Sequence, residues 1–266
     1  MKILFIGDIM GNPGMQAVSR AQVLFKEQGR AFDFVIGNVE NSANGFGINK
    51  DAWAKLQGLG LNCMTSGNHI WDRPEVNKYL NEEPRLLRPA NYPPGSPGFG
   101  WQVFEVKNKK TDNKITVINL QGRIYMQNID CPFQTAEHIL EDLGDRSNCI
   151  VVDFHADASS EKQAMGWFLD GRVSAVVGTH THVQTAEERV LPGGTGFITD
   201  VGMCGSYDSV IGMETEDALF RLIKGRPNRL RVATGNVKFA AVILDIDEKS
   251  GKCQNIERLL LDIPTI

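Results

Sequence analysis

The sequence has few residues that could form covalent cross-links or a cysteine-rich metal site. Its 266 residues include only five cysteines, which lie far apart and form no CxxC pair: Cys63, Cys131, Cys149, Cys204 and Cys253. An odd number of scattered cysteines, two of them in apolar strand-like runs, indicates buried free thiols rather than a disulfide framework. We therefore expect a reducing compartment.

Long apolar runs and blocks of positive charge are also absent. The N-terminal segment MKILFIGD turns polar after six residues, which is too short for the apolar region of a signal peptide or for a membrane span. The formal net charge is −4, which makes long nucleic-acid duplexes poor candidates for partners but leaves a small anionic substrate open. These absences favour a cytoplasmic protein without a membrane partner.

The composition is that of an ordinary globular protein. Hydrophobic residues make up 42% and charged residues 23%, so a sizeable core can form without disulfides or a structural metal. Apolar runs predict strands at 2–7, 32–38, 61–68, 101–106, 114–120, 149–155, 173–180, 237–246 and 256–262. Helical spacing predicts helices at 14–29, 50–59, 72–82, 134–143, 160–170 and 214–224.

The alternation of strands and helices predicts a layered α/β fold. Strands 101–106 and 114–120 are expected to form a hairpin across the polar turn 107–113, so the sheet should be mixed. The segment GGTG at 193–196 lacks the context of a phosphate-binding loop and indicates a second hairpin turn. Because no long linker or internal repeat interrupts the chain, one domain over residues 1–266 is expected.

Residues of metal-ligand type follow the predicted strands, at the point where each strand ends. Two histidines end one strand in VVGTHTHVQT, and another ends a strand in VVDFH. In open α/β sheets, sites form beyond the carboxyl ends of the strands, so these side chains are expected to meet. The set is Asp8, Glu40, Asn41, Asn68, His69, His155, His180 and His182. The remaining histidine, His138, lies on a predicted helix, where we expect a surface or capping role.

Taken singly, each of these residues also has a structural interpretation. A turn, a helix cap, a solvated loop or a hydrogen-bonded core histidine would account for one residue at a time. Their repeated occurrence at successive strand ends favours a common site.

Carboxylate, amide and imidazole groups in this number suit two metal ions better than one. In two-metal sites, ions about 3.5–4 Å apart clamp a transferring phosphoryl group and activate water. Glu40 is the natural bridging carboxylate, and the absence of cysteine ligands argues against structural zinc. His69 follows a ligand directly without being consumed as one, so it is suited to protonate a leaving alkoxide.

These segments resemble the calcineurin-like metallophosphoesterase superfamily. The resemblance is carried by GD at 7–8, GNH at 67–69, the strand-end His155 and GTHTH at 178–182. The usual superfamily pattern begins with D-x-H and has an Asp in the second motif, whereas this chain has Met10 and Glu40-Asn41. These departures resemble one subgroup, the YmdB-like 2′,3′-cyclic-nucleotide phosphodiesterases, and the similarity spans nearly the whole chain.

The resemblance implies a four-layer fold, in which a β-sandwich of mixed sheets is flanked by helices, with a dinuclear site at the strand ends. One ion would take Asp8, Glu40, Asn41 and His182, and the other would take Glu40, Asn68, His155 and His180. The subgroup implies iron, and mixed ligation rich in oxygen is also compatible with manganese. A hydroxide bridging the ions would attack phosphorus, and His69 would be the proton donor.

The sequence defines substrate contacts only weakly. The candidates are Arg88, Asn91, Gly202 and Met203, and a loop or turn interpretation competes with each of them.

We therefore expect a metal-dependent phosphodiesterase or phosphatase that acts on small phosphate esters, 2′,3′-cyclic nucleotides among them. Three alternatives stay open: a phosphomonoesterase or phosphoprotein phosphatase using the same site, a regulatory protein that binds a nucleotide without catalysis, and a mononuclear hydrolase. The resemblance also suggests a homo-oligomer, either a dimer or a tetramer, although the sequence reveals no interface.

Overall fold

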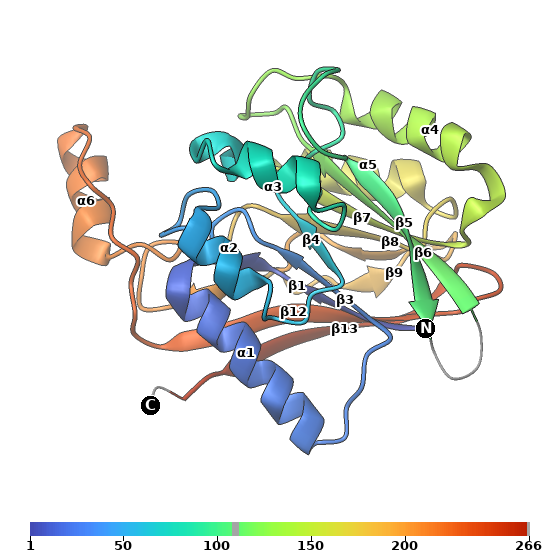
Figure 1. The fold of residues 1–266 in the computed structure, drawn as a ribbon, viewed down its shortest axis with the longest axis horizontal. Coiled ribbons are helices and arrows are strands. Elements are labelled where there is room, and N and C mark those ends of the chain that lie inside the picture. Colours follow the sequence, from blue (N-terminus) through green and yellow to red (C-terminus); the bar gives the residue numbers. More distant parts are fainter. Residues whose placement is uncertain (108–111, 265–266) are drawn as a thin grey trace.

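Two mixed β-sheets form the centre of the protein (Figure 1). The computed structural model describes residues 1–107 and 112–264, except for the side chains of Lys107 and Asp112. The middle of the expected turn at 107–113 therefore lies outside the described residues. The two strands that flank this turn pair antiparallel, with Trp101 opposite Ile118, as the predicted hairpin requires.

The first sheet has seven strands in the order β2-β11-β12-β1-β3-β4, with β13 paired to β12. Its strands are β1 (Lys2–Ile6), β2 (Asp8–Ile9), β3 (Phe34–Asn38), β4 (Cys63–Thr65), β11 (Met203–Ser206), β12 (Val237–Ile246) and β13 (Cys253–Asp262). Strands β1, β3 and β4 run parallel, so their carboxyl ends share one edge of the sheet.

The second sheet has six strands in the order β5-β6-β7-β8-β10-β9. Its strands are β5 (Trp101–Lys107), β6 (Asp112–Gln121), β7 (Cys149–His155), β8 (Ala175–Thr179), β9 (Arg189–Val190) and β10 (Gly196–Ile198). Strands β6, β7, β8 and β10 run parallel, and the register places His155 beside Thr179, the residue before His180. Strands β9 and β10 pair antiparallel across 191–195, which confirms the hairpin predicted around GGTG.

The two sheets pack face to face, and helices cover their outer faces. Buried Phe5 and Ile36 of the first sheet pack in one cluster with Val117, Val151 and Val177 of the second. Helices α1 (Gly11–Glu27), α2 (Lys50–Leu56) and α3 (Val76–Glu82) cover the first sheet, and α4 (Pro132–Leu143) and α5 (Ser159–Leu169) cover the second. This arrangement confirms the predicted four-layer α/β fold.

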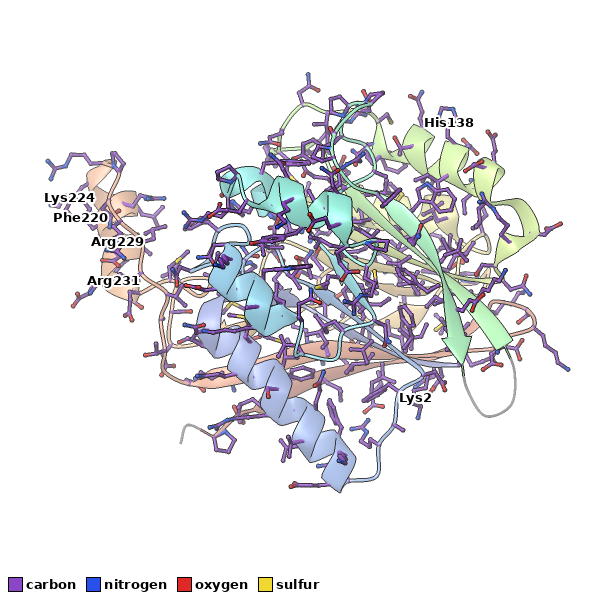
Figure 2. The ribbon with its side chains drawn as sticks, in the orientation of Figure 1. Lys2, His138, Phe220, Lys224, Arg229 and Arg231 are labelled. Atoms are coloured by element: carbon purple, nitrogen blue, oxygen red, sulfur yellow. The ribbon has the colours of Figure 1, made fainter. Side chains whose placement is uncertain are left out.

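Helix α6 (Thr215–Lys224) stands apart from these layers (Figure 1). Ala218 is its only buried residue, and Phe220 and Lys224 extend away from the body of the protein (Figure 2). His138 is exposed on α4, as the sequence predicted (Figure 2). No helix in the described part of the chain combines the length and the apolar character needed to cross a bilayer.

Two predicted elements were placed wrongly, and both lie beside the candidate site. The strand expected over 61–68 is only Cys63–Thr65, because the extended backbone ends before the 3₁₀ turn η1 (Asn68–Asp72). The helix expected to begin at Asp72 begins at Val76. Arg73 is extended (φ −126°, ψ 115°) because it precedes Pro74, and a proline disfavours helical backbone in the residue before it. The short strands β2 and β11 and the 3₁₀ turn η2 (Gly144–Arg146) were not predicted, since two to four residues show no legible period. Strands β9 and β10 were predicted only through the hairpin turn between them, without bounds.

Candidate metal centre

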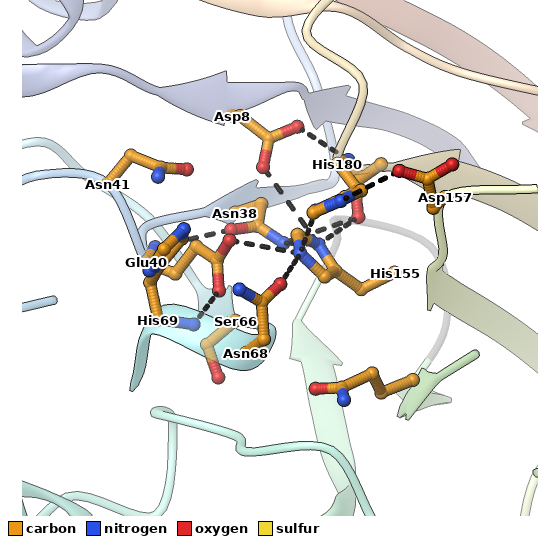
Figure 3. A network of polar contacts seen from close by, with 12 residues as sticks. Asp8, Asn38, Glu40, Asn41, Ser66, Asn68, His69, His155, Asp157 and His180 are labelled. Carbon is orange, nitrogen blue, oxygen red and sulfur yellow. Dashed lines mark hydrogen bonds and ion pairs between the residues drawn. The ribbon is translucent and has the colours of Figure 1, made fainter. Parts of the chain in front are cut away.

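His155, at the carboxyl end of β7, is the centre of the candidate site (Figure 3). Its Nε2 lies 2.9 Å from Glu40 Oε1, 3.1 Å from Asn68 Oδ1 and 3.0 Å from His180 Nδ1. A single ring nitrogen carries at most one proton, so hydrogen bonds alone cannot satisfy all four atoms, whereas a shared cation can. Glu40, His155 and His180 each offer a ligand atom, and these atoms lie within 4.8 Å of one another.

The opposite nitrogen of His155 is held by two further buried residues. Nδ1 lies 2.9 Å from Thr179 Oγ1, and the Thr179 hydroxyl donates a hydrogen bond of 2.7 Å to Asp153 Oδ1. Because the hydroxyl proton is used in this way, the Thr179 oxygen is free to accept the Nδ1–H of His155. This tautomer leaves a lone pair on Nε2, as a metal-ligating histidine requires.

Asp8, Asn41 and His182 form a second group of donor atoms. Asp8 Oδ1 and Asn41 Oδ1 are buried and have no hydrogen-bond partner among the described residues. The other polar atom of each side chain is engaged: Asp8 Oδ2 accepts the His180 N–H at 3.1 Å, and Asn41 Nδ2 donates to Gly45 O at 2.9 Å. His182 Nδ1 donates to Ile211 O at 2.8 Å, which leaves Nε2 as a ligand atom. Unpartnered buried oxygens are costly, so the donor chemistry of this group also fits a cation.

The buried carboxylates of the site draw positive charge toward them. Burial opposes the ionisation of Glu40, but the adjacent His155 imidazole outweighs it and holds the pKa of Glu40 at about 2. Burial likewise opposes the charging of His155, but the carboxylates of Glu40, Asp8 and Asp153 outweigh it and raise the pKa of His155 to about 9. Burial and the neighbouring His155 together lower the pKa of His180 to about 3, so His180 is a neutral imidazole near neutral pH. The proton on His155 supplies positive charge to these carboxylates, and a cation bound at Nε2 would take the place of that proton.

The loop that carries His180 and His182 adopts an uncommon backbone. Both residues have positive φ, 106° and 65°, in a region that side-chain-bearing residues rarely occupy. The loop is held from behind by the buried carboxylate of Asp200, whose Oδ2 accepts the Thr181 N–H at 3.0 Å and lies 2.6 Å from Lys162 Nζ. The turn between the two histidines gives their side chains different partners, His155 for the first and Ile211 O for the second.

A cavity of about 410 Å³ opens above these donor atoms. His69 lies on its wall together with Glu40, Asn41, His180 and His182. Asp72 Oδ2 lies 2.7 Å from His69 Nδ1 and orients the ring, so that Nε2 is left without a partner in the described part of the chain. The backbone N–H of His69 donates to Glu40 Oε2 at 2.9 Å.

The structure thus brings all eight residues that follow the strand ends to one place. Glu40, Asn68, His155 and His180 are in direct contact, Asp8 contacts the loop of the two histidines, and Asn41, His69 and His182 line the same cavity. Met10, which replaces the first-motif histidine of the superfamily, packs with Met203 and Met213 beside them.

The four weaker candidates have structural contacts. Arg88 donates to the backbone carbonyl oxygens of Pro89 at 2.8 Å and Pro97 at 3.2 Å, and Asn91 exchanges hydrogen bonds with the Gln121 backbone at 2.8 and 2.9 Å. Gly202 accepts the Asp8 N–H through its carbonyl oxygen at 3.0 Å. Among the described residues, none of these three, nor Met203, lines the cavity. A direct contact of any of them with substrate stays a prediction.

Several further residues support the site and were not among those predicted from the sequence. Asp153 interrupts the apolar strand CIVVDFH, and a carboxylate in a strand buried along its whole length was a legible signal. Thr179, Lys162 and Asp200 gave no comparable signal, because their function depends on contacts between distant segments.

Comparisons with known proteins match almost the whole chain. The family model described as YmdB-like protein matches residues 4–259. A 2′,3′-cyclic-nucleotide 2′-phosphodiesterase of Bacillus subtilis (strain 168) is 43% identical over 262 residues, which cover 98% of this chain and 97% of that protein.

Solved structures match equally broadly. A hypothetical protein from Thermus thermophilus has a TM-score of 0.91 at 39% identity, covering 99% of this chain and all of that one (100%). A novel phosphatase from Mycoplasma pneumoniae has a TM-score of 0.89 at 31% identity, covering 98% of this chain and 93% of that one. The similarity therefore includes both sheets and every strand end that carries a candidate ligand.

Proposed function

Because the chain belongs to the YmdB-like protein family and is a metallophosphoesterase, we propose that it hydrolyses 2′,3′-cyclic nucleotides at a site for two metal ions. The observation that carries this proposal is the convergence of Glu40, Asn68, His155 and His180 around one point. The name of the Bacillus subtilis relative supports the class of substrate. The cavity of about 410 Å³ lies within the range of sites that enclose a small ligand.

The proposed ligands form two sets that share Glu40. Asp8, Glu40, Asn41 and His182 would hold one ion, and Glu40, Asn68, His155 and His180 would hold the other. The unpartnered oxygens of Asp8 and Asn41 support the first set, and the crowded lone pairs around His155 Nε2 support the second. We propose iron as the metal, with manganese as the alternative, since imidazole, amide and carboxylate ligands suit both. Bound there, the ions would supply Lewis acidity and an activated water.

The protein's own residues position the ligands and move the proton. Asp153 and Thr179 orient His155, and Asp200 and Lys162 hold the loop of His180 and His182. His69 would donate its proton from Nε2 to the leaving oxygen, with the ring oriented by Asp72.

Metal analysis paired with an activity panel tests the proposal. We expect two metal ions per chain, and turnover of 2′,3′-cyclic AMP to 3′-AMP that is lost on chelation and restored by added Mn²⁺. One ion per chain would contradict the dinuclear site. Faster turnover of 3′-AMP or of a phosphopeptide would favour the phosphatase alternative, for which the name of the Mycoplasma pneumoniae relative speaks. Nucleotide binding without any turnover would favour a sensing function.

We also propose a cytoplasmic location. All five cysteines are free, and Cys63, Cys149, Cys204 and Cys253 are buried. Free thiols persist in reducing compartments, which supports the cytoplasm.

Helix α6 supports the proposal of a homo-oligomer, with a dimer as the smallest form. Leu222 and Ile223 are 73% and 69% exposed, which leaves an apolar helix face uncovered. The first turn of the helix carries Glu216 and its last residue is Lys224, so an antiparallel second copy of α6 would pair these opposite charges. A second copy of this chain therefore fits the face by both charge and apolar character.

We expect the wild-type protein to sediment as a dimer or tetramer, and Leu222→Glu with Ile223→Glu to reduce it to a monomer. A charge buried without a partner in the interface would disfavour association. Val23→Glu, at a position on α1 that is 54% exposed, is the matched control and should leave the assembly intact. A monomeric wild type at micromolar concentration would contradict the proposal.

A further inference from the structure

A second cavity, of about 530 Å³, adjoins the cavity of the candidate metal centre. Phe46, Arg221 and Leu230 line both cavities and so form their common wall. Four arginines line this second cavity, and no acidic side chain of the described residues does: Arg73, Arg221, Arg229 and Arg231. We refer to it as the arginine cavity.

Three of these arginines form no ion pair with a carboxylate among the described residues. Arg231 is neutralised by Asp217, with Nε and Nη2 at 2.7 and 2.9 Å from the two carboxylate oxygens. Arg73 and Arg221 donate only to backbone carbonyl oxygens, of Phe46 at 3.2 Å and of Asn228 at 2.7 Å. The side chain of Arg229, beside α6 in Figure 2, forms no hydrogen bond or ion pair within the described ranges 1–107 and 112–264, although its charge helps to lower the pKa of Asp217. The arginine cavity is thus locally positive in a chain of net charge −4, as expected for an anion site.

The position of His69 indicates which part of a substrate would face the arginine cavity. In hydrolysis of a 2′,3′-cyclic phosphate, water forms a bond to phosphorus, the bond from phosphorus to the 2′ oxygen breaks, and that oxygen takes a proton. Because the 2′ oxygen stays on the ribose, the ribose must lie on the side of the proton donor. The ring of Phe46 packs edge-on against the His69 ring, with 5.1 Å between centroids. Because Phe46 also lines the arginine cavity, that cavity lies on the same side as the proton donor and within reach of groups attached to the ribose.

We propose that the arginine cavity binds a second phosphate, attached to the 5′ oxygen of the ribose whose cyclic phosphate is hydrolysed. This inference rests on the proposed function and narrows the substrate class, from free cyclic mononucleotides to ribonucleotides with an additional 5′ phosphate. That phosphate is either a terminal monoester or the link to a preceding nucleotide, as at the 3′ end of a short oligoribonucleotide. Guanidinium groups bind both through charge-assisted hydrogen bonds.

Three substrates test the inference: 2′,3′-cyclic AMP, its 5′-phosphorylated form, and the dinucleotide ApA ending in a 2′,3′-cyclic phosphate. We expect kcat/KM of the wild type to favour both larger substrates by about tenfold, the order of one charge-assisted hydrogen bond. Arg229→Gln should abolish most of this preference, and so should raised salt. Equal preference for the two larger substrates would identify the phosphate alone as the bound group. Preference for the dinucleotide alone would show that the preceding nucleoside is bound as well.

Arg172→Gln is the matched control, because Arg172 is a partly exposed arginine that pairs with Glu137 outside both cavities. It should keep the wild-type preference. Equal kcat/KM for all three substrates, or a preference that survives in Arg229→Gln, would overturn the inference and leave the proposed function standing.

A binding measurement separates failure of the inference from failure of the proposed function. Calorimetric titration compares adenosine 3′,5′-bisphosphate with 3′-AMP on the Mn²⁺-loaded protein and on its Arg229→Gln variant. We expect the bisphosphate to bind about tenfold more tightly to the wild type, and this advantage to be lost in the variant. If no cyclic substrate is hydrolysed, the proposed function fails. Equal binding of the two nucleotides would then overturn the second-phosphate site as well, and selective binding would support it.

Discussion

We expect His69→Ala to lower the turnover of 2′,3′-cyclic AMP by about 10²–10⁴-fold, the usual contribution of a general acid, and to leave the metal content of the purified protein unchanged. The His69 ring lies on the cavity wall, where its Nδ1 pairs with Asp72 rather than with a proposed metal ligand. His69 contacts the proposed ligand Glu40 through its backbone N–H, which donates to Glu40 Oε2. An alanine at this position keeps the same backbone N–H. Loss of the proton donor and loss of the metals are therefore separable in this variant.

The leaving group provides the control for His69→Ala. Bis(p-nitrophenyl) phosphate releases a phenolate that needs no proton, so the variant should hydrolyse this ester at close to the wild-type rate. Asp72→Asn, which weakens the orientation of the ring but keeps the donor, should give an intermediate defect on the cyclic nucleotide. If the turnover of both esters fell equally, or if the variant lost metal together with activity, His69 would not be the general acid.

We expect Lys162→Met to destabilise the protein by about 3–5 kcal/mol, because the substitution leaves the Asp200 carboxylate buried without its cation. Both side chains are 1% exposed, and Nζ lies 2.6 Å from Asp200 Oδ2. The same carboxylate accepts the N–H groups of Thr181 and Gly202, which border the histidine loop and the strand β11. Equilibrium unfolding in urea measures the change in the free energy of unfolding.

A second lysine, whose Nζ lies at the same distance from a carboxylate oxygen, provides the control for Lys162→Met. Lys238 Nζ lies 2.6 Å from Asp262 Oδ1, but the Asp262 side chain is 80% exposed. Lys238→Met should therefore cost less than about 1 kcal/mol. Combining Lys162→Met with Asp200→Asn should recover part of the loss, since an amide is less costly to bury than a carboxylate. If Lys162→Met lowered the free energy of unfolding by no more than Lys238→Met does, burial would not be the reason that the Lys162–Asp200 pair stabilises the protein.

The sequence predicted most of the layers because strands buried on both faces read as largely apolar runs. CIVVDFH and the run before Thr179 are such strands, and their ends gave the candidate ligands. The elements that escaped prediction are those whose ends depend on a single backbone conformation. The residue before Pro74 separates a 3₁₀ turn from α3, and no hydrophobic period marks that boundary.

The sequence indicated which types of residue form the site, but it did not predict which side chains contact one another. The tautomer of His155 depends on a hydroxyl and a carboxylate placed by the register of β7 and β8. The arginine cavity combines Arg73 with arginines from 221–231, and these segments meet only in the folded chain. Side-chain pairs across two sheets have no periodic signature, which is why the supporting residues could not be predicted.

The donor atoms come from both sides of the sandwich, and this has a thermodynamic consequence. Glu40 and Asn68 follow strands of the first sheet, whereas His155 and His180 follow strands of the second. A cation bound by all four groups is retained only while the two sheets stay packed together. The free energy of unfolding therefore depends on the concentration of the free ion. At a free ion concentration of 100 times Kd, such linkage adds about 2.7 kcal/mol. The proposed ligands would then have two functions: they would bind the catalytic ion, and through that ion they would hold the two sheets together reversibly.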